Sequence, residues 1–145
     1  ALGGATARSA MRMESVRTPA GTLVLNDAYN ANPESMRNGL ETLVSVAQER
    51  SVAVLGAMLE LGSDSAKLHS EIGQYAARLG VDVVVVVGET ARPIATGFGA
   101  EAVYCETIDV AVGTLLASLQ PSDTVLVKAS RSIALEKLVA AIAAS

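Results

Sequence analysis

Short apolar runs alternate with longer amphipathic stretches along most of the chain. The apolar runs are typical of buried strands, which we expect at 22–27, 52–55, 83–87, 102–105 and 124–127. The amphipathic stretches predict helices at about 33–49, 65–79, 90–98, 108–119 and 131–144. In the first of these, a 3.6-residue period places one set of apolar residues on a single face: Met36, Leu40, Leu43, Val44 and Ala47. This alternation is the pattern of strand–helix–strand units.

The two N-terminal runs differ from the rest because only a short turn separates them. Residues 11–16 and 22–27 flank Pro19 and Gly21, which favour a tight turn, so the two runs should pair as an antiparallel hairpin. The later strands are joined through helices by short connections, which requires right-handed crossovers and parallel pairing. We therefore expect an α/β fold: a Rossmann-like, doubly wound and mostly parallel sheet of about six strands, with an antiparallel N-terminal edge strand.

Composition supports one α/β unit. The chain has 145 residues, of which 50% are hydrophobic but only 3% aromatic, so Val, Leu, Ile and Ala must fill the core. Such a core suits buried parallel strands covered by helices. Residues 1–10 begin without Met and show no strong strand or helix pattern. We therefore interpret 1–10 as an interdomain linker and 11–145 as one domain of a larger protein.

Charge and cysteine content argue against several classes of function. The net charge is −4 and no cluster of Lys or Arg stands out, which argues against nucleic acid or an anionic membrane as a partner. No run reaches about 18 apolar residues and no secretory signal is visible, so we expect no membrane insertion and a cytoplasmic setting. The one cysteine, Cys105, excludes an internal disulfide, and its apolar neighbours favour a buried structural role.

In a doubly wound sheet, ligands bind beyond the carboxyl ends of the strands. This rule selects five segments: 26–35, 56–65, 88–92, 106–109 and 128–132. The first is the most polar, with the sequence "NDAYNANPESM" from residue 26. Asn32 followed by Pro33 has the form of a helix N-cap and first helical residue, so Asn32 has a structural explanation. Asp27, Tyr29 and Asn30 precede the cap, and for them a structural role and ligand contact both remain open.

A second polar cluster follows the last predicted strand. Lys128, Ser130, Arg131 and Ser132 lie where the final helix begins. Two cations beside a helix N-terminus favour binding of a carboxylate or a phosphate. The alternative is that both cationic side chains simply extend into solvent.

The remaining polar candidates carry less information. His69 lies within a predicted helix without a second His or Cys at metal-ligand spacing, so we expect a surface or half-buried residue. Glu60 and Asp64 could be caps, supporting groups or neither. "GFGAEA" at Gly97 precedes a strand, which is the wrong context for a dinucleotide fingerprint. The chain also lacks G-x-x-x-x-G-K-[ST], so it does not cradle nucleotide phosphates by itself.

Four motifs together resemble the C-terminal domain of the Mur ligases: "NDAYNANPESM", "VLGAMLELG", "LHSEIG" and "LVKASRSIALEKLV". The resemblance runs from about Met11 to the C-terminus, and "MRME" is similar to the Arg-Met-Glu that opens this domain. Within the Mur ligases, the sequence most resembles the branch that joins D-Ala-D-Ala to UDP-N-acetylmuramoyl-tripeptide in peptidoglycan precursor synthesis. Two positions depart from the family pattern, because Ala57 replaces a usual acidic residue and Ala129 a common glycine.

The resemblance implies a three-domain enzyme, which we expect to be a monomer. An N-terminal domain would hold the UDP-sugar tripeptide, and a central domain would carry the P-loop and Mg²⁺ sites. ATP would phosphorylate the tripeptide carboxylate, and the amine of D-Ala-D-Ala would attack the acyl phosphate. The fragment alone would then be inactive. The alternative from the residues is a stand-alone flavodoxin-like or Rossmann-like binding module without catalysis, since fold alone does not decide function.

The resemblance also implies roles for individual residues. Those matching family positions near ATP and the interdomain cleft are Arg12, Asp27, Tyr29, Asn30 and Asn32. Those matching the segment near the incoming dipeptide are Lys128, Ser130 and Arg131. No residue is assigned as catalytic or as a metal ligand. This fits the chemistry, because an α-amino group has a pKa of about 8 and needs no strong base to act as a nucleophile.

Overall fold

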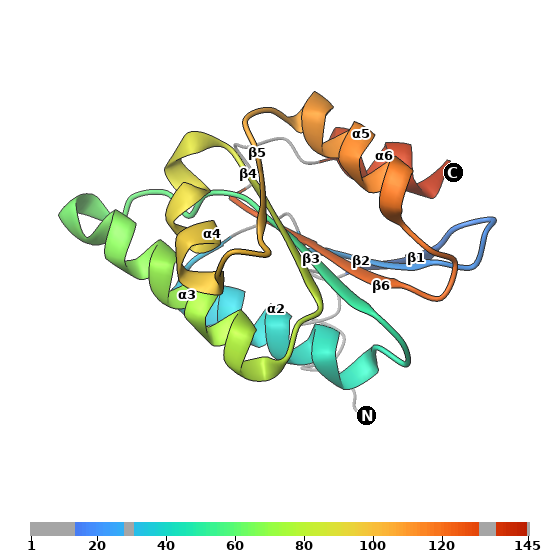
Figure 1. Ribbon diagram of the computed structural model, residues 1–145, viewed down its shortest axis with the longest axis horizontal. Coiled ribbons are helices and arrows are strands. Elements are labelled where there is room, and N and C mark those ends of the chain that lie inside the picture. The colour runs from blue at the N-terminus through green and yellow to red at the C-terminus, as the bar shows by residue number, and fades with distance from the viewer. Residues whose placement is uncertain (1–13, 28–30, 131–135, 145) are drawn as a thin grey trace.

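Six strands form one mixed sheet in the computed structural model, which describes residues 14–27, 31–130 and 136–144 (Figure 1). The strands are β1 (Glu14–Arg17), β2 (Leu23–Asp27), β3 (Ser51–Leu55), β4 (Val83–Val87), β5 (Val103–Cys105) and β6 (Thr124–Lys128). Their order across the sheet is β1-β2-β6-β3-β4-β5. Only β1 and β2 pair antiparallel, and every other pair is parallel. The predicted fold class is therefore confirmed.

The β1–β2 hairpin closes through the predicted turn. Thr18 donates its N–H to the carbonyl of Thr22 at 2.8 Å, and Gly21 donates its N–H to the carbonyl of Thr18 at 2.8 Å. Gly21 has a φ of 102°, a left-handed conformation that glycine adopts without strain. The turn sets the register in which Ser15 faces Leu25 and Val16 faces Val24.

Helices cover both faces of the sheet. They are α2 (Pro33–Val46), α3 (Ser65–Leu79), α4 (Arg92–Phe98), α5 (Ile108–Ser118) and α6 (Glu136–Ala143). Short 3₁₀ turns at Gly62–Asp64 and Glu89–Ala91 precede α3 and α4. In Figure 1, α2, α3 and α4 lie on one face and α5 and α6 on the other. α2 ends three residues before the predicted 49, because the chain turns there to enter β3 at Ser51.

Alternate residues of the inner strands contribute to two separate hydrophobic cores, one on each face of the sheet. On β6, Leu126 packs toward α2, α3 and α4, whereas Val125 and Val127 pack toward α5 and α6. Cys105 belongs to the second core and is buried, as its apolar neighbours predict. Because both faces of the sheet are covered, β3 and β6 are buried along their whole length.

Glycines allow α3 and α4 to pack closely. A Cβ on Gly73 of α3 would lie 2.0 Å from the carbonyl oxygen of Ile94, and one on Gly97 of α4 would lie 2.0 Å from that of Ser70. Gly97 therefore serves helix packing, and "GFGAEA" forms no dinucleotide loop before a helix.

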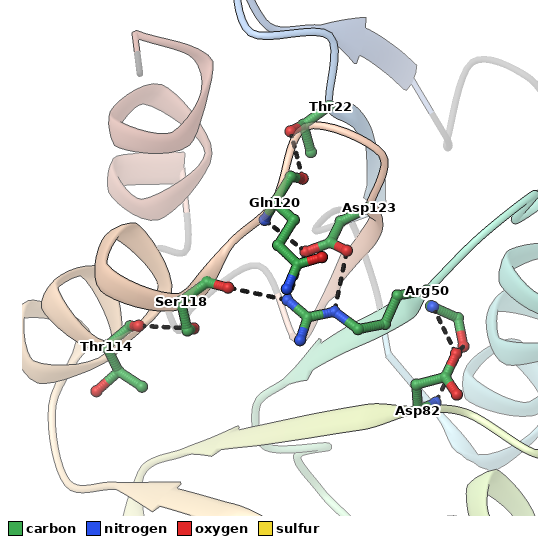
Figure 2. Close-up of polar contacts among 8 residues, drawn as sticks. Thr22, Arg50, Asp82, Thr114, Ser118, Gln120 and Asp123 are labelled. Atoms are coloured by element: carbon green, nitrogen blue, oxygen red, sulfur yellow. Dashed lines mark hydrogen bonds and ion pairs between the residues drawn. The ribbon is translucent and has the colours of Figure 1, made fainter.

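A polar network fixes the amino ends of the strands (Figure 2). Arg50 donates from Nε and one terminal nitrogen to the buried carboxylate of Asp123, at 3.0 and 2.7 Å. The same terminal nitrogen of Arg50 donates to the carbonyl of Ser118 at 2.9 Å. Beside this pair, the carboxylate of Asp82 accepts the N–H of Ser51 at 2.8 Å. These bonds join the starts of β3, β4 and β6 to the end of α5.

At the opposite edge of the sheet, the helices that follow β2, β3 and β6 do not all cover the same face. β6 lies between β2 and β3, and the helices that follow β2 and β3 cover one face of the sheet. The helix that follows β6 covers the other face. Chains that leave neighbouring strands in opposite directions open a space beyond the carboxyl ends, where α/β proteins bind ligands. The ends of β2, β3 and β6 are therefore the place to look for a site.

Candidate functional site

Asp27 and Lys128 form a buried ion pair at the carboxyl ends of β2 and β6. They are direct partners in the parallel register, and Nζ of Lys128 lies 2.8 Å from Oδ2 of Asp27. Lys128 is 1% exposed and Asp27 is 8% exposed. The family resemblance placed these residues in different sets, one near ATP and one near the dipeptide. The structure brings one member of each set, Asp27 and Lys128, into direct contact.

Helix α2 leaves room for the lysine. Lys128 lies among the largest fully buried side chains of the described residues. A Cβ on Gly39 of α2 would come within 3.0 Å of Cδ of Lys128, so its aliphatic chain runs against the helix at a position without a side chain. The alternative, in which Lys128 extends into solvent, is therefore excluded. Burial of its stem with a paired ammonium is the physical reason.

Asn32 caps α2 as its sequence context predicts. Its Oδ1 accepts the N–H of Ser35 at 2.8 Å, and Oγ of Ser35 accepts the N–H of Asn32 at 3.0 Å, which completes a capping box. Pro33 occupies the first helical position. The structural role of Asn32 is therefore confirmed, while its contact with ATP stays a prediction.

The loop after β3 is bonded to the end of β6. Gly56 donates its N–H to the carbonyl of Lys128 at 3.0 Å, and Ser130 donates its N–H to the carbonyl of Ala57 at 2.9 Å. Ala57 and Ala129, the two departures from the family pattern, are both buried. The segment that carries Lys128 and Ser130 is thus tied to the ends of both β2 and β3.

His69 anchors the same loop from α3. Its Nε2 accepts the N–H of Met58 at 2.9 Å, and its Nδ1 lies 2.7 Å from the carbonyl of Ser65. An N–H on Nδ1 and a bare Nε2 satisfy both contacts, so the ring is neutral. Burial lowers the pKa of His69, partly opposed by the hydrogen bond to Ser65. Because His69 is fully buried, the expectation of a surface or half-buried residue is wrong.

Described residues line two hollows beside this edge. One, of 290 Å³, is lined by the ends of β3, β4 and β5 and includes Ala57, Gly88, Glu89, Glu106 and Thr107. It joins three of the five segments that the strand-end rule selects. A second, of 550 Å³, lies between α3 and α4 and is flanked by Lys67 and Arg92. Of its lining residues, the strand-end rule selected only Glu89 and Arg92. It did not predict the contribution of α3, because the approach of α3 to α4 depends on tertiary packing at Gly73.

Some predicted residues fall outside the described ranges: Arg12, Tyr29, Asn30 and Arg131. Within the described ranges, no three His, Cys, Asp or Glu side chains gather where they could hold a metal ion. No described helix is long and apolar enough to cross a membrane. The residues seen here therefore offer a fixed carboxylate–ammonium pair and a tethered loop, without a metal centre.

Comparison with known proteins identifies the family. The family model described as "Mur ligase, glutamate ligase domain" matches residues 11–131. The chain belongs to the Mur ligase family. Among relatives in the Mur ligase family, the UDP-N-acetylmuramoyl-tripeptide–D-alanyl-D-alanine ligase of Mycobacterium tuberculosis (strain ATCC 25618 / H37Rv) is 40% identical over 160 residues. The match covers 93% of this chain and 31% of that relative.

Solved Mur ligase structures share the fold. The MurF ligase of Thermotoga maritima in complex with ADP superposes with a TM-score of 0.78 at 28% identity, covering 90% of this chain and 30% of that one. MurF of Acinetobacter baumannii superposes with a TM-score of 0.80 at 31% identity, covering 89% of this chain and 29% of that one. This chain thus spans about 30% of the length of the Mycobacterium tuberculosis relative and of both MurF structures. The family resemblance read from its motifs is confirmed.

Proposed function

We propose that the chain is the C-terminal domain of an ATP-dependent ligase that joins D-Ala-D-Ala to UDP-N-acetylmuramoyl-tripeptide. The observation that carries the proposal is the 40% identity to a ligase of that name over 93% of the chain. The ADP in the Thermotoga maritima relative supports the use of ATP. The reaction would take place in the bacterial cytoplasm, within a monomer whose N-terminal and central domains hold the sugar tripeptide and Mg²⁺.

The site residues divide into two neighbouring groups. Arg12, Asp27, Tyr29, Asn30 and Asn32 form the group that meets ATP, with Asp27 directed to the ribose. Ser130 and Arg131 hold the carboxylate of D-Ala-D-Ala. Lys128 belongs to this second group by sequence and is bonded to Asp27 of the first. The pair would therefore fix the distance between nucleotide and dipeptide, and this supports a shared site at the carboxyl edge.

The proposed chemistry asks the domain to position its substrate. ATP transfers its γ-phosphoryl group to the tripeptide carboxylate, and the dipeptide amine attacks the resulting acyl phosphate. The amide forms as phosphate leaves and the amine loses a proton. With an amine pKa of about 8, a usable fraction of the dipeptide is neutral near pH 7. Fixing the orientation of two reactants lowers a barrier by about 7–11 kcal/mol in the best cases.

Phosphate release by the intact protein that contains this domain tests the proposal. The protein is given ATP, Mg²⁺ and UDP-N-acetylmuramoyl-tripeptide, with D-Ala-D-Ala, with L-Ala-L-Ala or with no dipeptide. The proposal predicts release that depends on D-Ala-D-Ala and does not occur with L-Ala-L-Ala. Release that ignores the dipeptide would mean that the acceptor is wrongly assigned. No release under any condition would favour a binding module.

A further inference from the structure

Three consecutive residues after β3 are held by two separate parts of the molecule. Gly56 and Ala57 bond to the end of β6, through the carbonyl of Lys128 and the N–H of Ser130. Met58, the next residue, donates its N–H to Nε2 of His69 on α3. The loop is therefore clamped between β6 on one side and a helix on the other.

His69 is built as a rigid acceptor. Its ring is fully buried, and both nitrogens are engaged by main-chain groups. The hydrogen bond from Nδ1 to the carbonyl of Ser65, one turn earlier in α3, fixes both the tautomer and the ring orientation. A buried acceptor of this kind holds its donor firmly, because an unpaired N–H at Met58 would be desolvated without compensation.

The loop also contains a strained residue. Glu60 has a φ of 62°, a left-handed conformation that costs a non-glycine residue free energy. Such a conformation persists only where surrounding contacts determine it. The bond from Met58 to His69 fixes the chain two residues before Glu60.

The position of Ser130 depends on this loop. The parallel ladder of β6 ends at Lys128, which pairs with Asp27 and Leu55. Ser130 lies two residues beyond the ladder, and its N–H is bonded to the carbonyl of Ala57. The carbonyl of Ala57 and the N–H of Met58 belong to the same peptide group, so the bond to His69 and the bond to Ser130 hold its two ends. A shift of this peptide group would therefore move Ser130 more than it would move Asp27.

We propose that His69 is a positioning residue for the acceptor dipeptide, acting through Met58 and Ala57 on Ser130. The inference rests on the proposed function, because that function assigns Ser130 to the dipeptide. His69 touches no substrate. It fixes the loop after β3 through Met58, and this loop in turn fixes Ser130 through the carbonyl of Ala57. Ser130 belongs to the segment expected to bind the dipeptide carboxylate.

Two amide substitutions separate this role from simple packing. His69→Asn keeps a donor near the position of Nδ1 but has no atom that reaches the N–H of Met58. His69→Gln places an amide oxygen near the position of Nε2 and keeps the acceptor. In the intact ligase, His69→Asn should raise KM for D-Ala-D-Ala about three- to tenfold with little change in KM for ATP. His69→Gln should restore KM for the dipeptide to near the wild-type value.

Ile72→Ala is the matched control, because Ile72 is buried in the same helix and forms no side-chain hydrogen bond. It should lower stability and leave both KM values unchanged. Equal effects of His69→Asn on both KM values, or the same dipeptide effect from Ile72→Ala, would overturn the role of His69. Wild-type protein without dipeptide-dependent phosphate release would instead overturn the proposed function.

Amide hydrogen exchange gives a readout that needs no activity. In the intact protein, His69→Asn should speed exchange in peptides covering 56–61 and 126–130, and His69→Gln should leave both near wild type. Faster exchange confined to 56–61 would show that the loop does not control Ser130, and the inference would fail.

Discussion

Replacing Lys128 with Met should destabilise the fold and impair the site together. Methionine keeps most of the aliphatic stem that runs against α2 at Gly39, so little cavity forms. The substitution removes the ammonium that lies 2.8 Å from Oδ2 of Asp27. The carboxylate is then left in a site where Asp27 is only 8% exposed.

The magnitude follows from the distance and the burial. Two unit charges 2.8 Å apart attract by about 6 kcal/mol at an effective dielectric constant of about 20. Desolvation of both groups offsets much of that attraction in the wild type. Removing one partner of a buried pair costs about 3–5 kcal/mol, because the other charge stays buried. We expect Lys128→Met to lower the free energy of unfolding by about 3 kcal/mol, and Asp27→Asn with Lys128→Met to recover a large part of that loss.

Urea unfolding of the chain, followed by far-ultraviolet circular dichroism, measures these differences, since the sequence has no Trp to report by fluorescence. A double-mutant cycle over Asp27 and Lys128 gives the coupling free energy. Arg50→Met is the matched control at the other end of β6, because it removes the cation from the buried carboxylate of Asp123. In the intact ligase, Lys128→Met should raise KM for ATP and for D-Ala-D-Ala. Arg50→Met should lower stability and leave both KM values unchanged. A loss below about 0.5 kcal/mol for Lys128→Met, or a coupling near zero, would refute the reasoning.

Three further predictions concern other parts of the chain. Gly73→Ala should lower the free energy of unfolding by several kcal/mol, because its Cβ would lie 2.0 Å from the carbonyl oxygen of Ile94. Gly113→Ala, with open space around it, should stabilise α5 by about 0.5–1 kcal/mol. Equal effects of the two substitutions in thermal unfolding would contradict the packing account. Asn32→Ala should lower the free energy of unfolding by about 1 kcal/mol, and Asn32→Asp by much less, since aspartate keeps the capping oxygen. A raised KM for ATP in the stable Asn32→Asp variant would support nucleotide contact by Asn32, and an unchanged KM would count against it. The lowered pKa of His69 means that the unfolded chain binds a proton first, so stability should fall as pH drops below about 6.5 until the folded pKa is reached. The same pH titration of His69→Gln should lack this component, and parallel curves for both proteins would refute it.

The alternation of strands and helices was readable because each element is amphipathic or apolar by itself. The strand predicted at 124–127 is observed as Thr124–Lys128, and the helix predicted at 65–79 is observed as Ser65–Leu79. The hairpin followed from the turn chemistry of Gly21. These signals are local, so a sequence contains them without knowledge of the tertiary contacts.

The contacts of the site were not readable in the same way. The strand-end rule selected the segments that contain Asp27 and Lys128, but their pairing spans 101 residues and depends on β6 lying between β2 and β3. Strand order comes from the packing of both cores, which hydrophobic periodicity does not encode. The burial of His69 was missed for a related reason, since its partner is the main-chain N–H of Met58 in a loop. A lone histidine in a helix gives no sign of such an acceptor role.

The most direct test of the central claim concerns Arg131, the residue proposed to hold the dipeptide carboxylate. The measurement is KM for D-Ala-D-Ala and KM for ATP in the intact ligase with Arg131→Ala. If this domain presents the acceptor dipeptide to the acyl phosphate, KM for D-Ala-D-Ala should rise far more than KM for ATP. Equal changes in the two constants, or a rise in KM for ATP alone, would contradict the account.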